Sequence, residues 1–299
     1  MPSSRLDEGM NAVRTTDGTS RMREVPAELP PIARESEAPR GRFRRIGRMR
    51  RVIRPLAAAG FALAATAASA CPSALAGRTV AVDPATHGFG AVQKQPPLPL
   101  QPGEYVVTID DGPNPKTTPA LLDILRSRCI AATFFLVGRN AERHPELVRR
   151  IVAEGDGIGS HSFSHRDFGK LSRDGIAEEI WAGMRAVDIA AFGAFDESRR
   201  PRRLFRFPGS PGFAPALPPD LVAIANGAGA IVAGYDFSPE DWRNSPPEES
   251  FRRLLARLGD RGVILFHDGQ SNTLELLPMV LDELERRGAR VVRLAIGDG

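Results

Sequence analysis

Cysteine is almost absent from this chain, which has only two such residues, Cys71 and Cys129, among 299. Two cysteines are too few for a disulfide scaffold or for a zinc site made of four thiolates. Apolar runs of the roughly 20 residues that a membrane-spanning helix needs are also missing, which excludes a polytopic membrane protein. The composition of the whole chain, with 42% hydrophobic and 25% charged residues, is that of an ordinary globular protein.

An excess of charge of one sign is missing from most of the chain. Residues 1–70 hold 13 arginines and 7 acidic residues, whereas the rest holds 27 basic and 29 acidic residues. The formal charge of +4 therefore belongs to the N-terminal part of the sequence. Because the body of the chain is nearly balanced, its charge gives no reason to expect a nucleic-acid partner.

The first 70 residues resemble a leader rather than part of a fold. Residues 1–48 are polar and rich in Arg, Pro and Ser, so we expect them to be disordered or to precede the true start at Met49. Residues 49–70 combine a basic head, an apolar run and a small-residue end at 68–70, which are the three parts of a secretory signal peptide. The sequence thus predicts an exported protein, periplasmic or secreted. Anchoring through an uncleaved segment or through Cys71 stays open.

The rest of the chain divides into a linker and one alternating α/β region. Residues 71–103 contain several Pro and Gly and little periodicity, which predicts a linker. From Glu104 onward, apolar strands alternate with amphipathic helices, a pattern typical of a parallel sheet covered by helices. Seven such units predict a distorted, incomplete (β/α) barrel with about seven parallel strands. The predicted strands are Tyr105–Ile109, Ile130–Val137, Gly157–Ser160, Leu204–Arg206, Ala230–Tyr235, Val263–Phe266 and Arg290–Leu294.

Polar residues with metal-binding chemistry follow two of these strands. Asp110 and Asp111 close the first strand, although an Asp pair before Gly-Pro is also a common way to start a turn. His161 and His165 follow the third strand four residues apart, and we expect them to share one face of a helical turn. Because the ends of parallel strands meet at one rim, two histidines and one Asp could hold a metal ion with open coordination positions.

Three further strand ends carry groups suited to acid–base chemistry. His267 ends a buried strand, where it is either a hydrogen-bonded core residue or a general acid or base. Arg206 ends another strand before a Pro-Gly loop, and Tyr235, Asp236, Asp241 and Trp242 follow the strand at 230–235. Each signal is weak alone. Five of them on one rim indicate an active site.

In this order the five segments resemble the motifs of the polysaccharide deacetylases of carbohydrate esterase family 4. The resemblance covers about residues 104–295 and implies that 104–299 form the catalytic domain. It implies a general base, Asp110, and a metal triad made of Asp111, His161 and His165. It also implies one divalent metal ion, with zinc as the chemical default and cobalt or another divalent ion as alternatives.

The same resemblance assigns roles to the remaining site residues. Arg206 would hold the base in place, and the backbone N–H of Gly209 would contact the oxyanion. Asp241 would orient His267, the general acid, while Trp242 and Leu265 would line the acetyl pocket. The chain departs from the family pattern in the third motif, around Arg206, and at Tyr235 and Asp236, which bears on the substrate rather than on the metal centre.

Three functions remain open at this point. The leading hypothesis is a metal-dependent hydrolase that removes N-acetyl, or O-acetyl, groups from a polysaccharide or glycan. The first alternative is a saccharide-binding or envelope-assembly protein with little turnover, although none of the expected catalytic groups is missing. The other is an Fe(II) oxygenase, against which the alternating β/α pattern argues. The sequence names no protein partner, no particular sugar and no oligomeric state.

Overall fold

The computed structural model describes residues 73–195, 202–209, 217–243 and 245–297. The proposed leader, including residues 1–48, the signal peptide at 49–70 and Cys71, lies outside the described residues. None of the helices in the described part is both long enough and apolar enough to span a membrane.

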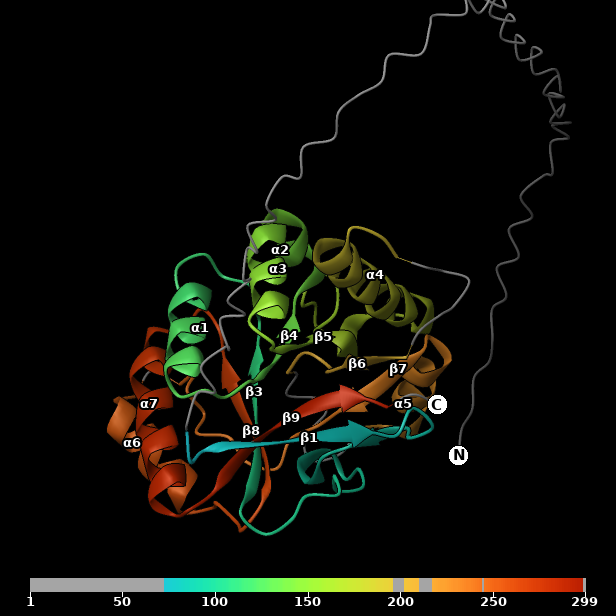
Figure 1. Cartoon of the computed structure of the whole chain (residues 1–299). Coiled ribbons are helices and arrows are strands. Elements are labelled where there is room, and N and C mark those ends of the chain that lie inside the picture. Colours follow the sequence, from blue (N-terminus) through green and yellow to red (C-terminus); the bar gives the residue numbers. More distant parts are fainter. Residues whose placement is uncertain (1–72, 196–201, 210–216, 244, 298–299) are drawn as a thin grey trace, which may run out of the picture. The chain divides into compact units, whose positions relative to one another are not determined.

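A single sheet of parallel strands organises the described residues (Figure 1). Its order is β1-β9-β3-β4-β5-β6-β7-β2, and β8 also pairs with β3. On the open side of the sheet, Phe237, which follows β7, forms an isolated parallel bridge with Ile264 of β8. The sheet therefore curves without closing as a regular barrel. The strands are β1 (Ala76–Val82), β2 (Gly88–Phe89), β3 (Glu104–Asp110), β4 (Thr133–Leu136), β5 (Gly157–Ser160), β6 (Arg203–Phe205), β7 (Ala230–Ala233), β8 (Gly262–His267) and β9 (Arg290–Ile296).

Helices cover the outside of the curved sheet, as βαβ connections require (Figure 1). They are α1 (Thr118–Ser127), α2 (Gly138–Arg143), α3 (Pro145–Ala153), α4 (Arg173–Phe192), α5 (Pro219–Gly227), α6 (Pro247–Leu255) and α7 (Ser271–Arg286), with short 3-10 turns η1 (Ala91–Gln93) and η2 (Phe168–Lys170). The α/β fold with seven predicted parallel strands is confirmed. Between β4 and β5 the chain forms two helices, α2 and α3, because Pro145 starts a new one.

The predicted linker is the clearest difference between sequence and structure. Residues 76–82 form β1, which pairs in parallel with β9, and Gly88–Phe89 form β2, which pairs with β7. Five of the seven residues of β1 are exposed, so the strand has no apolar pattern that a sequence could reveal. This segment therefore belongs to the sheet.

Strand β3 shows how the core sets up the site. All seven of its residues are buried, and successive side chains point to opposite faces. Val107 and Ile109 pack in the large cluster beneath the outer helices, whereas Val106 packs in the cluster inside the curved sheet. Thr108 and Asp110 share the inner face with Val106. The alternation therefore delivers the Asp110 carboxylate into the mouth of the barrel.

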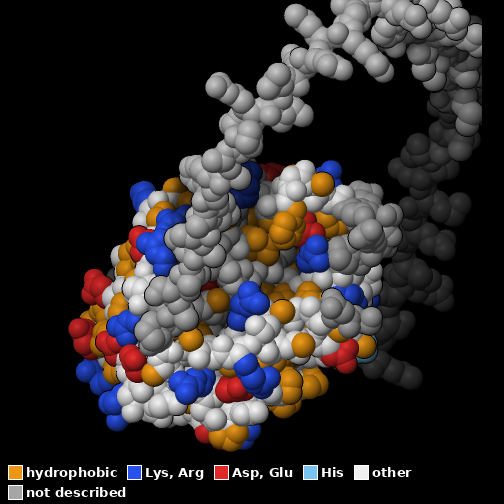
Figure 2. Space-filling view, viewed as in Figure 1, with side chains coloured by type: hydrophobic (Ala, Val, Ile, Leu, Met, Phe, Trp, Pro, Cys, Tyr) orange, Lys and Arg blue, Asp and Glu red, His pale blue; other side chains and the backbone are white. Residues whose placement is uncertain are grey.

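The surface is mixed in charge. On the face drawn in Figure 2, basic and acidic side chains of the described residues are interspersed. Many of them form exposed ion pairs, such as Arg126 with Asp123, at 2.7 Å. Exposed pairs of this kind contribute little to stability.

We predict that Asp156 destabilises the folded protein at neutral and alkaline pH. Its carboxylate is buried and accepts a hydrogen bond of 2.7 Å from the Ala132 N–H. Burial raises the pKa of Asp156 from 3.8 to about 7, since the Ala132 bond offsets that effect only in part. A raised carboxyl pKa means that stability is lost as pH rises from about 4 to 7. Asp156→Asn should therefore be more stable than the parent by roughly 1–3 kcal/mol at pH 8.

Urea denaturation at pH 4 and pH 8 measures this difference. At pH 4 the two proteins should be nearly equally stable, because Asp156 is then protonated in the folded state. The matched change at an exposed carboxylate, Asp260→Asn, should show no such gain at pH 8. An equal gain in both variants, or none in Asp156→Asn, would contradict the assignment.

Candidate active site

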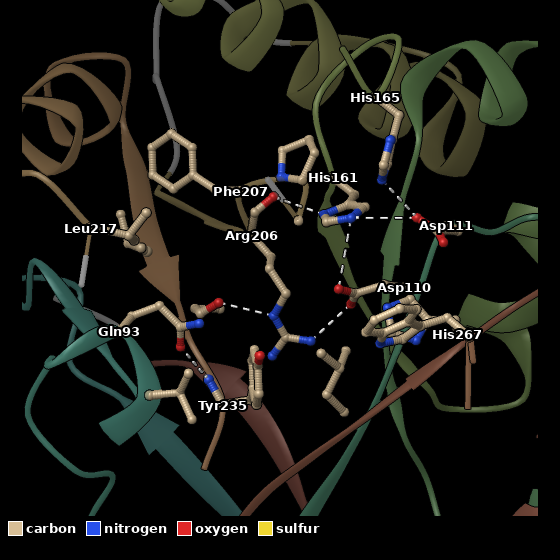
Figure 3. A pocket seen from close by; sticks show the side chains of 17 residues that line it. Gln93, Asp110, Asp111, His161, His165, Arg206, Phe207, Leu217, Tyr235 and His267 are labelled. Carbon is tan, nitrogen blue, oxygen red and sulfur yellow. Dashed lines mark hydrogen bonds and ion pairs between the residues drawn. The ribbon is translucent and has the colours of Figure 1, made fainter. Parts of the chain in front are cut away.

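A pocket of about 620 Å³ opens at the carboxyl ends of the strands (Figure 3). Chemistry in parallel α/β folds is found at this edge of the sheet. Nearly all of the residues predicted from the sequence line this pocket, namely Asp110, Asp111, His161, His165, Arg206, Gly209, Trp242, Leu265 and His267. The tenth, Asp241, is buried behind His267 and contacts its ring.

Arg206 is a buried cation whose donors are almost all occupied. Its Nη1 donates 2.8 Å bonds to Asp110 Oδ1 and Thr108 Oγ1, while Nε and Nη2 donate to the carbonyls of Ala233 and Gly234 at 3.0 and 2.8 Å. The guanidinium also lies 4.2 Å from the centre of the Phe135 ring. This one side chain thus joins the ends of β3, β6 and β7.

Asp110 is left with one oxygen for chemistry. Arg206 holds Oδ1, whereas Oδ2 faces the pocket at 3.7 Å from His161 Nε2 (Figure 3). The side chain is only 3% exposed, so the carboxylate is screened from bulk water. A fixed carboxylate with one free oxygen is the geometry expected of a general base.

Asp111, His161 and His165 converge on one point. Asp111 Oδ1 lies 3.4 Å from His161 Nε2 and 3.2 Å from His165 Nε2. One ligand atom from each of the three residues lies within 4.8 Å of the other two. No other His/Cys/Asp/Glu cluster of this kind occurs among the described residues.

The loop that presents the two histidines is not helical, so the predicted helical turn is wrong. Ser162 and His165 have φ of +66° and +56°, and the His165 N–H donates a 2.9 Å bond to Ser162 Oγ. Helix α4 supports this loop from outside, because Glu179 accepts hydrogen bonds from the Ser164 N–H and hydroxyl. A side chain at Gly183 would collide with the loop backbone at 2.5 Å, so glycine permits this approach.

The donor set fits a divalent metal ion. His161 Nδ1 lies 2.9 Å from the Arg206 carbonyl, which can only accept, so Nδ1 carries the proton and Nε2 is the free ligand atom. Asp111 Oδ1 is buried and faces the Nε2 atoms of both histidines, as expected of a ligand atom. A site of two imidazoles and one carboxylate leaves positions open for water and substrate.

Electrostatics favour the forms that bind metal. Burial would raise the pKa of Asp111, but the hydrogen bond from His165 and the charges of nearby histidines lower it to about 2. Burial lowers the pKa of His161, which outweighs the carboxylates that raise it. The hydrogen bond with Asp111 raises the pKa of His165, so a metal ion has to displace a proton there at low pH.

His267 and Asp241 form a hydrogen-bonded pair at the pocket. Asp241 Oδ1 lies 2.8 Å from His267 Nδ1, and its Oδ2 accepts bonds from the His267 N–H and the Thr273 hydroxyl. Burial alone would lower the pKa of His267, but the hydrogen bond with Asp241 outweighs it and raises the pKa to about 9. His267 therefore carries a proton at neutral pH, as a general acid must.

The remaining predicted residues surround the opening. Leu265, on β8, is buried and lines the pocket, whereas Trp242 is 53% exposed and the Arg243 guanidinium lies over its ring. Gly209 is exposed at the pocket edge. Their roles as pocket walls and oxyanion contact stay predictions.

Sequence reasoning missed several supporting residues. Asn140 holds the Asp111 carbonyl at 3.0 Å and so supports the left-handed backbone of Asp111 (φ +74°). Asp268, which is buried, accepts hydrogen bonds from the hydroxyls of Thr117 and Thr118 and so ties the end of β8 to the start of α1. Gln93, from the segment predicted as a linker, reaches the pocket wall. None has a sequence signal, because each depends on contacts between distant segments.

The fold and the site define an α/β protein with an Asp/His/His cluster, a clamped carboxylate and an Asp–His pair at its strand ends. A family model described as polysaccharide deacetylase matches residues 99–211, which include Asp110, Asp111, His161, His165 and Arg206. The chain belongs to the polysaccharide deacetylase family.

Individual relatives agree with this membership. The chain is 30% identical over 194 residues to a peptidoglycan-N-acetylglucosamine deacetylase of Bacillus cereus, over 63% of this chain and 85% of the relative. It is 28% identical to a chitooligosaccharide deacetylase of a Bradyrhizobium strain, over 62% of this chain and 86% of the relative. A solved peptidoglycan deacetylase of Bdellovibrio bacteriovorus is 31% identical with a TM-score of 0.59, and the match covers 74% of this chain but only 59% of that one.

We predict that His267 titrates near pH 9 in the metal-free protein. In Asp241→Asn the pKa of His267 should fall by about 2 units or more, because the carboxylate that opposes the effect of burial is gone. NMR titration of the imidazole protons measures both values. The adjacent change Glu240→Gln is the matched control and should leave the titration unchanged. A midpoint below pH 7 in the parent protein would refute the pairing.

Proposed function

We propose that this protein is an exported, metal-dependent hydrolase that removes N-acetyl groups, and in some substrates O-acetyl groups, from a polysaccharide or glycan. One observation carries the proposal. A clamped carboxylate, a metal-ligand triad and a protonated histidine line the same pocket, so a base, an electrophilic site and an acid can act on one amide bond.

Asp111, His161 and His165 would hold the ion, which we propose to be zinc. When bound, a divalent ion supplies Lewis-acid polarisation of the acetyl carbonyl and lowers the pKa of a water molecule. The carbonyl of Arg206 keeps the Nδ1 proton on His161, so the ring presents Nε2 to the site.

The chain's own residues then divide the proton transfers. Asp110 Oδ2 accepts a proton from the water that attacks the acetyl carbon, while Arg206 keeps Oδ1 and the carboxylate plane fixed. His267, held protonated by Asp241, donates a proton to the leaving sugar amine. The Gly209 N–H stabilises the oxyanion, and Leu265 and Trp242 enclose the methyl group.

The relatives narrow the substrate class. Proteins named peptidoglycan-N-acetylglucosamine deacetylase and chitooligosaccharide deacetylase are 27–30% identical to this chain. Both names describe N-acetylated glucosamine polymers, so we propose a substrate of that kind. Release of acetate from acetylxylan would test the O-acetyl reaction, in which the leaving group is a sugar hydroxyl rather than an amine.

We predict that the zinc-loaded protein releases acetate from chitooligosaccharides or peptidoglycan fragments, and that a chelator stops the release. Asp110→Asn should lower kcat by about 10²–10⁴-fold, because the base is lost while Arg206 and the metal ligands stay in place. Zinc affinity, measured by calorimetry, should be kept in Asp110→Asn and lost in Asp111→Asn. Acetate is quantified enzymatically, with Asp123→Asn, a change at an exposed carboxylate, as the control.

The outcome separates the hydrolase from the saccharide-binding alternative. Glycan binding without acetate release from any member of the panel would favour a binding or envelope-assembly protein. Acetate release that persists in Asp110→Asn would disprove the assigned base.

Export is the second part of the proposal, and its support is the pattern of residues 49–70. We predict that the native protein is found outside the cytoplasm and that its N-terminus lies close to Cys71, after cleavage at the small-residue end. Cell fractionation followed by N-terminal sequencing tests this. An N-terminus at Met1 or Met49 in an exported protein would show that the segment is retained as an anchor.

A further inference from the structure

The pocket has a second polar region on the side away from the metal ligands. Gln93 and Tyr235 line it, and Figure 3 places both across the Arg206 guanidinium from Asp111 and His165. Gln93 ends η1, after β2, and Tyr235 follows β7, so the wall joins segments more than 140 residues apart. Gln93 precedes the stretch that the family model matches and Tyr235 follows it.

Backbone contacts fix this wall firmly. The Val92 N–H donates a 3.0 Å bond to the Tyr235 carbonyl, and the Ala91 N–H donates a 2.8 Å bond to Asp236 Oδ1. Gly90, with φ of +110°, lies so close to the chain at Gly234 that a Cβ there would be 2.5 Å from the Gly234 carbonyl carbon. The segment from 90 to 93 is thus attached to the chain that follows β7 by hydrogen bonds and close packing.

The orientation of the Gln93 carboxamide follows from one hydrogen bond. The Tyr235 N–H donates to Gln93 Oε1 at 2.9 Å, and a donor requires the oxygen rather than the nitrogen at this position. Nε2 is therefore the end of the amide that remains available. Apart from the hydrogen bond between the Gln93 and Tyr235 side chains, neither Gln93 Nε2 nor the Tyr235 hydroxyl has a partner in the described part of the chain, so the second Nε2 proton and the hydroxyl proton remain to be donated.

The character of this region indicates its ligand. Its neighbours in the lining, Val92, Val232 and Ala233, are apolar, and its two polar groups are neutral donors. Sugars present apolar C–H faces together with neutral hydroxyl and ring oxygens, which accept hydrogen bonds from such groups. A charged ligand group would instead call for a free ionic partner, whereas Arg206 is already occupied.

We propose that the Gln93 carboxamide and the Tyr235 hydroxyl bind an oxygen of the glycan at a distance from the reacting acetyl group, and so select the substrate without taking part in the chemistry. This inference rests on the proposed function. The pair would act in the enzyme–substrate complex and in the transition state alike, so it should affect KM more than kcat.

Two variants separate substrate binding from a structural role. Gln93→Glu keeps an oxygen to accept the Tyr235 N–H bond but removes the donor. Tyr235→Phe removes the hydroxyl and keeps the ring, which lies 6.0 Å from the Arg206 guanidinium. Gln101→Glu makes the same change at an exposed glutamine outside the pocket lining, and is the matched control.

The experiment measures KM and kcat for acetate release from N-acetylchitotetraose by the zinc-loaded protein. We expect Gln93→Glu and Tyr235→Phe each to raise KM about 5- to 20-fold with kcat changed less than about 2-fold, and Gln101→Glu to match the parent. An unchanged KM in both variants, or a loss confined to kcat, would overturn the inference.

Calorimetric binding of chitotetraose, the deacetylated product, keeps this test separate from the proposed function. If the parent binds chitotetraose but releases no acetate, the proposed hydrolase fails, and a Kd weakened about 5- to 20-fold in both variants still supports the pair. Equal Kd values in parent and variants, or no binding of chitotetraose by the parent, would count against glycan binding by Gln93 and Tyr235.

Discussion

The buried ion pair between Arg206 and Asp110 is the interaction on which the rest of the site depends. Removing a guanidinium and a carboxylate from water costs several kcal/mol for each ion, and the cost is offset only if their remaining hydrogen-bonding groups are satisfied. Here two backbone carbonyls, the Thr108 hydroxyl and the Phe135 ring complete the surroundings of Arg206. The strand ends of β3, β6 and β7 must therefore meet in one register before the pair can form.

The same residue couples Asp110, the proposed base, to the proposed metal site. The Arg206 side chain orients Asp110, while its main-chain carbonyl fixes the proton on His161 Nδ1. One residue at the end of β6 thus sets both which Asp110 oxygen is free and which His161 nitrogen is free. Packing also supports this arrangement. The Phe135 ring, which lies against the Arg206 guanidinium, packs directly on Gly159, where a Cβ would come within 2.7 Å of the ring.

The chemistry was predictable from sequence because it depends on strand ends, and the periodicity of strands and helices reveals where these fall. Asp110, His161, Arg206 and His267 were found in this way. The loop conformation was not predictable, since the left-handed backbone of Ser162 and His165 is stabilised by Glu179 and Gly183 from another element. The segment before residue 104 gave no signal either, because its strands are short or exposed and are held by backbone bonds to distant parts of the chain.

The pocket consequently has two halves of different origin. The half with Asp110, Asp111 and the two histidines comes from strand ends inside the stretch that the family model matches. The half with Gln93 and Tyr235 comes from segments on either side of that stretch, and the Arg206 guanidinium lies between the two halves (Figure 3). Because almost all Arg206 donors are already engaged by the protein, Arg206 has little capacity to bind a ligand in either half. If the proposed function holds, changes at Gln93 or Tyr235 alter which glycan fits while the geometry of Asp110, the Asp111/His161/His165 triad and His267 is preserved.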